Sequence, residues 1–394
     1  MPFDFDTVIP RRGTGSNKWE QYPEDVLPMW VADMDFPSPE PVVQALHERA
    51  DHRFFGYASP ATKLAEAVCE RLARLYRWDV TPEQVVFVPS LVSGINIVCR
   101  ATGTSGSSVL TLVPAYPPFL GAPANHGLVC DTLELTETVD GRTLHYDLDL
   151  DAFAGAIHER TRLLLLSSPH NPVGKIYAPE TLRSMAEICL RNNVVICSDE
   201  IHCDLLLGGA RHTPLATLAP EIAERTVTLM SPSKTFNLPG LGCGLAIVPN
   251  PALRKQLQQA SAGIVPHVNV MGLAAAHAAF TRCEDWLEEL RAYLTANRDY
   301  LIRYLAEQLP QLRYTVPQAT YLAWIDCREA GIGGSPYRFF LDEARVALGE
   351  GKGFGAAYEP YVRLNFGCPR ALLVEGLERM RMALERAGAR RQAA

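Results

Sequence analysis

Short apolar runs alternate with longer amphipathic segments between residues 85 and 248, and this pattern restricts the fold more than any other feature. The apolar runs are Val85–Val88, Ser108–Val113, Leu128–Leu133, Leu163–Ser167, Val194–Cys197, Thr226–Met230 and Cys243–Val248. Segments with helical spacing or turn signals lie between them: Ser90–Ala101, Tyr116–Asn125, Leu150–His158 and Ala178–Arg191. Strands that alternate with helices predict an α/β fold with a mostly parallel sheet sandwiched by helices.

The two ends of the chain have a different pattern. Helices are expected at Pro39–Asp51, Lys63–Trp78 and Trp286–Gln308, and strands at Tyr321–Ile325 and Val362–Asn365. We therefore predict three parts: an N-terminal segment, residues 1–45, that packs with the small domain; a large domain, residues 46–285; and a smaller C-terminal α+β domain, residues 286–394. A chain of 394 residues is long enough for this division.

Charge, hydropathy and cysteine spacing exclude several classes of protein. The net charge of −7 argues against a nucleic-acid binder, since such proteins need basic surfaces to contact phosphates. No run of eighteen apolar residues occurs, so we expect no membrane partner. The first residues, Met1–Asp6, are acidic and lack an apolar core, so we expect no signal peptide. The ten cysteines are scattered singly, which predicts reduced thiols in the cytoplasm and no metal site.

Lys234 follows the apolar run Thr226–Met230 and is flanked by Ser231 and Ser233. Desolvation at a strand end disfavours the ammonium form, and a lysine with a lowered pKa is a good nucleophile that can form a Schiff base. The two serines could bind a phosphate beside it. Taken alone, the lysine is more simply explained by a head group that reaches solvent at the end of the strand.

Other strand ends carry side chains that suit the same ligand, because ligands of parallel sheets bind at the carboxyl ends of the strands. Val92 and Ser93 open a helix, where backbone amides can bind a phosphate. Tyr116 could stack on a flat ring, the Asn171 amide could reach a ligand oxygen, and Asp199 ends an apolar strand, where a carboxylate needs a cation. Each residue alone has an ordinary structural explanation. Together they match the needs of pyridoxal 5'-phosphate, whose pyridine nitrogen a carboxylate would keep protonated.

A family resemblance extends over nearly the whole chain. The motifs that carry it, in chain order, are Trp30–Phe36, Phe55–Tyr57, Pro114–Phe119, Pro169–Gly174, Ser198–His202, Ser231–Asn237, Thr320–Trp324 and Val362–Asn365. With these motifs the chain resembles fold-type I pyridoxal-phosphate enzymes of the aminotransferase class I/II group. It is most similar to their cystathionine β-lyase (C–S lyase) branch, represented by MalY and PatB.

The resemblance implies a role for each residue around the cofactor. Lys234 would hold the cofactor through a Schiff base and later move the Cα proton, Asp199 would pair with the pyridine nitrogen, and Tyr116 would stack on the ring. The remaining cofactor-binding residues would be Asn171 and His202 near the ring hydroxyl, and Val92, Ser93, Ser231 and Ser233 at the phosphate.

The resemblance also implies how substrate and subunits bind. Arg363 would grip the carboxylate of a small amino-acid substrate through a bidentate fork, with Asn171 and the backbone near Ala32 completing the pocket. Tyr57, in the loop Phe54–Pro60, would reach the phosphate in the neighbouring subunit of a homodimer.

Three functions remain open at this point. The leading one is a carbon–sulfur β-lyase that acts on L-cystathionine or an S-substituted L-cysteine, because His202 stands where plain aminotransferases usually have tyrosine. The second is an aminotransferase, and a β-replacement enzyme shares the same early chemistry. The third is a pyridoxal-phosphate-binding regulatory protein. The run Gly349–Gly355, expected near the substrate side chain, matches the lyase branch only loosely.

Overall fold

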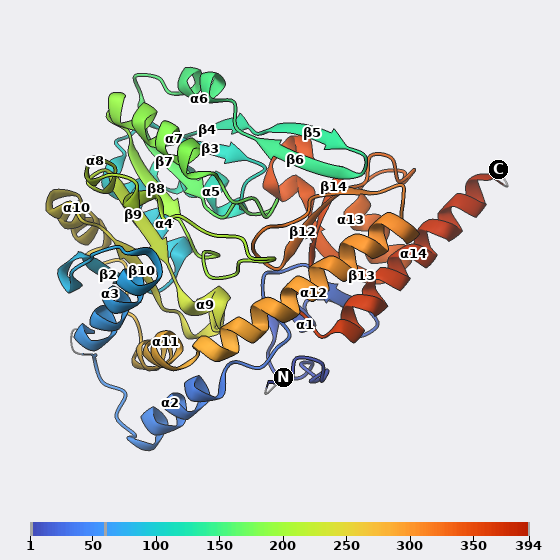
Figure 1. Cartoon of the computed structure of the whole chain (residues 1–394), viewed down its shortest axis with the longest axis horizontal. Helices are drawn as coiled ribbons and strands as arrows, with labels where there is room; N and C mark the ends of the chain where they lie inside the picture. Colours follow the sequence, from blue (N-terminus) through green and yellow to red (C-terminus); the bar gives the residue numbers. More distant parts are fainter. Residues whose placement is uncertain (1–2, 59–60, 393–394) are drawn as a thin grey trace.

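The computed structural model describes residues 3–58 and 61–392 and contains two seven-stranded sheets with helices packed around them (Figure 1). The first sheet has the order β2-β10-β9-β8-β7-β3-β4. Its strands are β2 (Val85–Val88), β3 (Ser108–Val113), β4 (Val129–Glu134), β7 (Thr161–Ser167), β8 (Val195–Asp199), β9 (Thr226–Met230) and β10 (Gly244–Ile247). Strands β4, β3, β7, β8 and β9 run parallel, whereas β10 is antiparallel to both of its neighbours.

The helices of the chain have the following bounds. They are α1 (Asn17–Glu20), α2 (Glu40–Asp51), α3 (Thr62–Tyr76), α4 (Leu91–Thr102), α5 (Pro117–Gly121), α6 (Leu150–Ala156), α7 (Pro179–Arg191), α8 (Pro220–Ala223), α9 (Pro232–Thr235), α10 (Pro251–Ser261), α11 (Val270–Arg282), α12 (Glu284–Gln308), α13 (Pro336–Phe339) and α14 (Arg370–Gln392).

Alternating side chains of β10 show that the first sheet is covered on both faces. Leu245 and Ile247 pack into a cluster with residues of α3, whereas Ala246 packs into the cluster that contains α4 and α7. Successive side chains of a strand point to opposite faces, so the two clusters lie on opposite sides of the sheet. This arrangement explains why its strands, apart from the edge strand β4, are mostly apolar.

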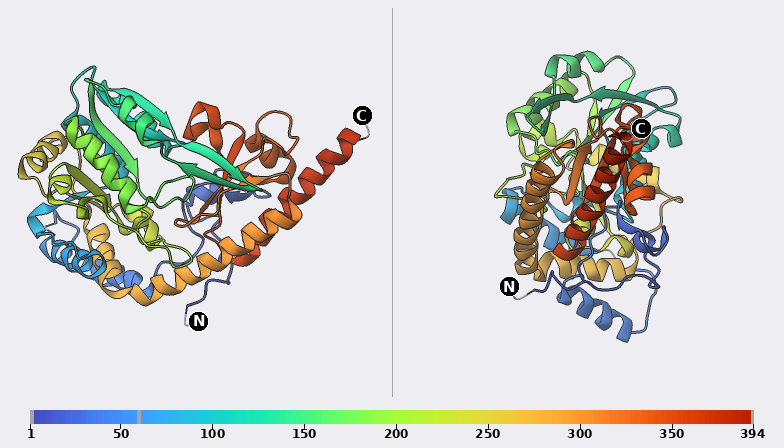
Figure 2. Two further views of the ribbon diagram at one scale, coloured as in Figure 1. Left: turned by 45° about the horizontal axis from the view of Figure 1, so that its top comes forward. Right: turned by 90° about the vertical axis from the view of Figure 1, so that its right-hand side faces the viewer.

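The second sheet has the order β1-β13-β14-β12-β11-β6-β5. Its strands are β1 (Leu27–Met29), β5 (Thr136–Asp140), β6 (Thr143–Asp147), β11 (Arg313–Tyr314), β12 (Leu322–Asp326), β13 (Val346–Glu350) and β14 (Tyr361–Asn365). The N-terminal residues join this sheet because β1 pairs in parallel with β13. The long helix α12 runs from α11 to the second sheet, where it packs against α14 (Figures 1 and 2).

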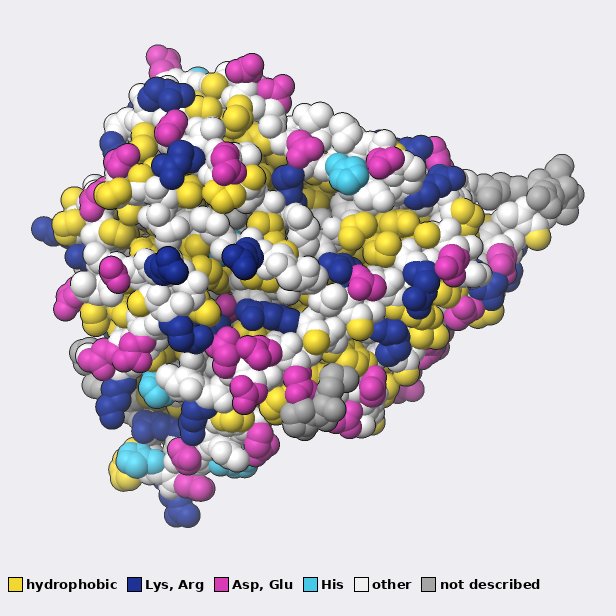
Figure 3. Space-filling model, in the orientation of Figure 1, with side chains coloured by type: hydrophobic (Ala, Val, Ile, Leu, Met, Phe, Trp, Pro, Cys, Tyr) yellow, Lys and Arg dark blue, Asp and Glu magenta, His cyan; other side chains and the backbone are white. Residues whose placement is uncertain are grey.

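The structure departs from the sequence-based expectation at several elements. The β5–β6 hairpin, β1, β11 and β13 were not predicted, and the helix expected over Tyr116–Asn125 is reduced to α5, Pro117–Gly121. In the predicted loop Phe54–Pro60, Ser59 and Pro60 lie outside the described residues. Over the described ranges, no helix combines the length and apolarity that a bilayer crossing needs. Acidic and basic side chains are interspersed on the face shown in Figure 3.

Candidate active site

A cavity of about 250 Å³ lies where the carboxyl ends of β7, β8 and β9 meet the second sheet. Its lining includes most of the residues predicted from the sequence: Ala32, Val92, Tyr116, Asn171, Asp199, His202, Ser231, Ser233, Lys234 and Arg363. Ser93 and Tyr57 do not line it. The fold thus brings together side chains that are more than 300 positions apart in the sequence, from Ala32 to Arg363.

Lys234 lies on the short helix α9, which follows β9 and begins at the N-cap Ser231. Its Nζ donates a hydrogen bond to the carbonyl oxygen of Ala32 at 2.5 Å. Burial, with the nearby charge of Arg363, lowers the pKa of Lys234 to about 8, although Asp33 and Asp199 oppose the shift. An amine with this pKa is partly neutral near neutral pH and is therefore able to act as a nucleophile or a base.

Asp199 is the last residue of β8, and His202 lies three residues later in the turn that follows the strand. One carboxylate oxygen of Asp199 accepts a hydrogen bond from the backbone of Ile201 at 3.1 Å, and burial raises the pKa of Asp199 to about 7. Burial lowers the pKa of His202 to about 3, which keeps its ring neutral. Its Nδ1 is buried and makes no hydrogen bond within the described parts of the chain. A buried carboxyl that is bonded to a backbone N–H, and a buried ring nitrogen that makes no hydrogen bond to the described residues, are suited to a polar ligand.

Arg363 on β14 is held in a fixed orientation by three neighbours. Its two terminal nitrogens donate to the side-chain oxygen of Asn171 at 3.1 Å and to the carbonyl oxygen of Trp30 at 2.9 Å. Its guanidinium lies 4.9 Å from the ring centre of Phe354. Its Nε is buried and makes no hydrogen bond to any described residue. Burial lowers the pKa of Arg363 to about 10, so the group stays charged and can bind a carboxylate.

Two of the predicted phosphate ligands are already used within the protein. The backbone N–H of Ser93 donates to the Ser90 side chain at 3.1 Å, which caps α4. The Ser231 hydroxyl donates to the carbonyl oxygen of Cys243 at 2.7 Å and accepts from the backbone of Ser233. Val92, at the first turn of α4, lines the cavity. These caps position the first turns of α4 and α9, which supports an indirect contribution of Ser93 and Ser231 to the site.

Tyr57 lies away from the cavity and is fully exposed, with a relative exposure of 103%. Phe54 and Phe55 beside it are also largely exposed, at 73% and 60%. Three neighbouring aromatic side chains in water are unusual for a monomer surface and are typical of a contact site.

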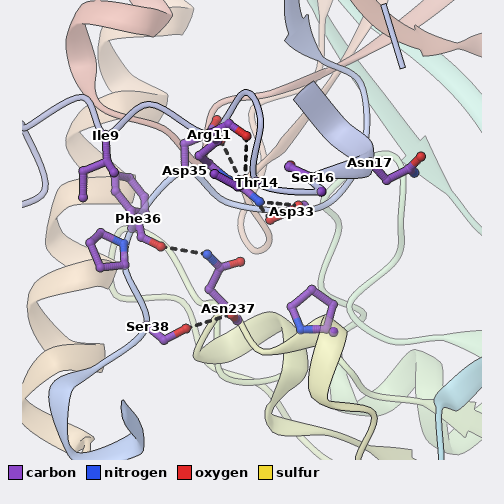
Figure 4. Close-up of a pocket in the computed structure, with 14 residues that line it drawn as sticks. Ile9, Arg11, Thr14, Ser16, Asn17, Asp33, Asp35, Phe36, Ser38 and Asn237 are labelled. Atoms are coloured by element: carbon purple, nitrogen blue, oxygen red, sulfur yellow. Dashed lines mark hydrogen bonds and ion pairs between the residues drawn. The ribbon is translucent and has the colours of Figure 1, made fainter. Parts of the chain in front are cut away.

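A second, larger cavity of about 540 Å³ adjoins the first, and Pro239 lines both. Arg11, Asp33 and Asp35 gather on one side of it, and Asn237 and Ser38 lie on the other (Figure 4). Sequence reasoning placed no ligand here. The signal that could have indicated it is the pair of carboxylates in the segment Ala32–Phe36, which no apolar strand can bury alone.

Comparison with known proteins identifies the family. The chain matches the aminotransferase class I and II family over residues 24–380. It is 36% identical to cystathionine β-lyase PatB of Bacillus subtilis, with 97% of this chain and 100% of PatB covered. It is 30% identical to the protein MalY of Escherichia coli, with 95% of this chain and 97% of MalY covered.

A solved structure extends this likeness to three dimensions. The pyridoxal-phosphate-bound C–S lyase of Staphylococcus hominis superimposes with a TM-score of 0.89 at 30% identity, covering 97% of this chain and 98% of that one. The fold class predicted from the sequence is thereby confirmed. The chain belongs to the aminotransferase class I and II family, in the branch that contains PatB and MalY.

Proposed function

We propose that the protein is a pyridoxal-phosphate-dependent carbon–sulfur β-lyase, which cleaves L-cystathionine or an S-substituted L-cysteine to pyruvate, ammonia and a thiol. The observation that carries the proposal is the Lys234 amine with its lowered pKa, which shares one cavity with Asp199 and Arg363. Relatives over nearly the full length of the chain are named cystathionine β-lyases, and a structural neighbour is named a C–S lyase, which supports the same activity.

The side chains present fit the cofactor. A protonated pyridine nitrogen would supply the cation that the buried carboxyl of Asp199 lacks, and a ring hydroxyl would suit the unpartnered Nδ1 of His202. Tyr116, which is half-buried in the cavity wall, would contact the ring. The first turn of α4 at Val92 and the start of α9 at Ser233 would bind the phosphate.

Pyridoxal phosphate, when bound, supplies an electron sink for the negative charge that develops at the substrate Cα. The chain's own residues do the rest. Arg363, held by Asn171 and Trp30, would bind the substrate carboxylate and fix the orientation of the Cα–H bond. The neutral amine of Lys234 would take the Cα proton, after which the thiolate leaves from Cβ. A lysine with an ordinary pKa would stay protonated and could not serve as this base.

An aminotransferase is the second candidate, because the same residues would serve both reactions until the Cα proton has been removed. The matched family takes its name from that activity. The two functions differ in the step after the Cα proton has been removed: in an aminotransferase Lys234 would deliver its proton to a different carbon, whereas in a lyase the substituent on Cβ would leave. The names of the relatives in the PatB and MalY branch favour loss of the substituent.

The proposal includes a homodimer in the cytoplasm. The exposed aromatic loop at Phe54, Phe55 and Tyr57 would dock on a second copy, with Tyr57 completing the phosphate site of that copy. The ten cysteines are all free thiols, which suits a reducing compartment.

One assay separates the two candidate functions. The holoenzyme should convert L-cystathionine to pyruvate, ammonia and a thiol in equal amounts without any keto acid, while the cofactor stays in its aldehyde form. A requirement for a keto acid, with the cofactor accumulating as the amine in its absence, would assign the protein as an aminotransferase.

A further inference from the structure

The buried side chain of His170 has no role in the chemistry described so far. It lies three residues after the end of β7, and neither His170 nor Tyr177 lines the catalytic cavity. Each of these two residues is only 1% exposed. Because a buried polar ring needs a partner for each of its nitrogens, the contacts of the His170 ring show which parts of the protein it connects.

The His170 ring is held in one tautomer by two hydrogen bonds. Its Nε2 lies 2.8 Å from the carbonyl oxygen of Pro114, which can only accept, so Nε2 carries the hydrogen. Burial lowers the pKa of His170 to about 4, which leaves the ring neutral with a single N–H. Its Nδ1 therefore accepts from the hydroxyl group of Tyr177, at 2.9 Å.

The main chain makes a rigid turn around this ring. The backbone N–H of His170 donates to the carbonyl oxygen of Lys175 at 2.8 Å, and the N–H of Gly174 donates to the carbonyl oxygen of His170 at 2.8 Å. Asn171, which lines the catalytic cavity, lies inside this turn. Whatever anchors the His170 ring therefore also determines where Asn171 lies.

The other end of the anchor lies beside a second residue of the cavity. Pro114 is the first residue after β3 and lies two positions before Tyr116, which lines the cavity. Strands β3 and β7 are neighbours, but their pairing stops two residues before both strands end. The bond from His170 to Pro114 therefore connects the two loops beyond the last paired residues of the strands.

Further contacts close a circuit that starts and ends at His170. After Pro114, the backbone N–H of Ala115 donates to the carbonyl oxygen of Phe354 at 2.9 Å. The ring centre of Phe354 lies 4.9 Å from the guanidinium of Arg363. Arg363 in turn donates to the side chain of Asn171 at 3.1 Å, and Asn171 directly follows His170. A change at the His170 ring should therefore shift Asn171 and Arg363 together, relative to the loop of Tyr116.

We propose that His170 is a positioning residue, which holds the loop of Tyr116 and the turn of Asn171 at a fixed separation on two sides of the cofactor. Tyr177 fixes the tautomer that makes this possible. The inference rests on the proposed function and assigns a role to a side chain outside the catalytic cavity. The expected effect is large, because a displacement of about 1 Å at a reacting site can cost about 100-fold in rate.

The first test compares two substitutions of His170. His170→Leu removes both hydrogen bonds, whereas His170→Gln keeps an N–H that can donate to the carbonyl of Pro114. In the His170→Leu holoenzyme, kcat/KM for L-cystathionine should fall at least about tenfold. The visible circular-dichroism band of the bound cofactor should lose at least about a third of its intensity, because Tyr116 contacts the ring differently. In His170→Gln both quantities should return to within about twofold of the wild-type values.

The second test removes only the hydroxyl group of Tyr177. Tyr177→Phe should lower kcat/KM at least about threefold, because the His170 ring loses the bond that fixes its tautomer. Tyr304→Phe is the matched control: the Tyr304 hydroxyl donates to Glu378, between α12 and α14 and outside the catalytic cavity. Both substitutions remove one tyrosine hydrogen bond, but Tyr304→Phe should change kcat/KM by less than about 1.5-fold.

All kinetics and spectra are recorded below the unfolding temperature of each variant, so that a loss of stability is measured separately. A purely structural role would lower the unfolding temperatures of His170→Leu and Tyr177→Phe but leave kcat, KM and the cofactor band at wild-type values, and this result would overturn the proposal. Equal losses in His170→Leu and His170→Gln would also contradict it.

Two further outcomes remain decisive. If His170→Leu does not fold, Tyr177→Phe decides by kinetics, and ¹⁵N NMR of the wild-type holoenzyme should show a neutral His170 with its hydrogen on Nε2; a hydrogen on Nδ1 would refute the proposal. If the lyase function fails, the wild-type protein itself forms no pyruvate. In that case the cofactor band still compares the variants, so the two failures are distinguishable.

Discussion

At the scale of single residues, the Lys234 amine disfavours the folded state of the protein without cofactor. Its pKa falls from an ordinary 10.5 to about 8 on folding, so the folded state binds fewer protons between these values and stability rises with pH across that window. Below pH 8 the burial of the charged Lys234 amine destabilises the folded state by its full amount. Lys234→Met should therefore raise the free energy of unfolding at pH 7 by roughly 1–3 kcal/mol, and the gain should vanish above about pH 10. Urea titration of the cofactor-free proteins measures this, with the exposed Lys255→Met as control; a loss of stability in Lys234→Met would contradict it.

Asp199 should affect catalysis rather than cofactor binding. Its carboxylate is proposed to keep the pyridine nitrogen protonated, and this charge matters most when negative charge develops at Cα. Asp199→Asn should bind the cofactor but lose at least about 100-fold in kcat, with little change in KM. Steady-state kinetics on the spectroscopically saturated variant provides the measurement. A nearly normal kcat would show that another group protonates the ring.

Sequence reasoning indicated those residues of the candidate cavity that follow strands, and it missed contacts that only the tertiary structure creates. Lys234 and Asp199 could be predicted because each stands directly after a buried apolar run. The carbonyl of Trp30, which orients Arg363, lies 333 positions away from it in the sequence. The ring of Phe354 lies only nine positions before Arg363, but it belongs to a short 3-10 helix, Gly351–Phe354, that has no clear sequence pattern. Ser93 was predicted as a phosphate ligand, but its backbone N–H donates to the side chain of Ser90, the N-cap of α4. No sequence pattern distinguishes an amide bonded to an N-cap from an amide that binds a ligand.

At the scale of elements, a buried charge cluster joins α3, the turn after β8, α9 and α12. Asp204 accepts from Arg71 at 2.9 Å and from Thr235, next to Lys234, at 3.1 Å, while Arg71 also binds Glu284 at 2.8 Å. Removing one partner of a buried pair leaves the other charge uncompensated. Asp204→Asn should therefore cost about 2–4 kcal/mol of unfolding free energy.

The matched control for this cluster is Arg74→Gln. Arg74 binds the same Glu284 but is 54% exposed, so its loss should cost less than about 1 kcal/mol. Chemical denaturation of both variants tests the comparison. Similar small losses in the two variants would mean that Asp204 does not hold these elements together.

The elements that could be predicted are those with a strong local pattern. The strands of the first sheet other than the edge strand β4 are mostly apolar, and β2, β3 and β9 have the bounds expected from their sequence. The β5–β6 hairpin is polar and lies at the edge of the second sheet, so its alternation is weak, although Asp140-Gly141 is a hairpin turn signal. Strands β1 and β13 are short and pair with each other across more than 300 residues, which no local pattern can indicate.

At the scale of the whole molecule, the exposed aromatic loop predicts that each active site needs two subunits. If Tyr57 serves the neighbouring site, mixing inactive Tyr57→Ala and Lys234→Ala proteins should restore up to about a quarter of wild-type activity, because half of a random mixture is hybrid with one intact site. Phe119→Ala, a core substitution that no partner can complement, is the control for the mixing procedure. Verified hybrid dimers without activity would place Tyr57 outside the neighbouring site.

The central claim is that Lys234 holds the cofactor, and covalent labelling tests it directly. The chain has six lysines; Lys18 is buried and paired with Asp35, while Lys63, Lys175, Lys255 and Lys352 lie outside the catalytic cavity. Borohydride reduction of the holoenzyme, followed by peptide mass spectrometry, should place the pyridoxyl group on the peptide that contains Lys234, and Lys234→Met should remain unlabelled. Label on any other lysine, or no label after saturation with pyridoxal phosphate, would contradict the account.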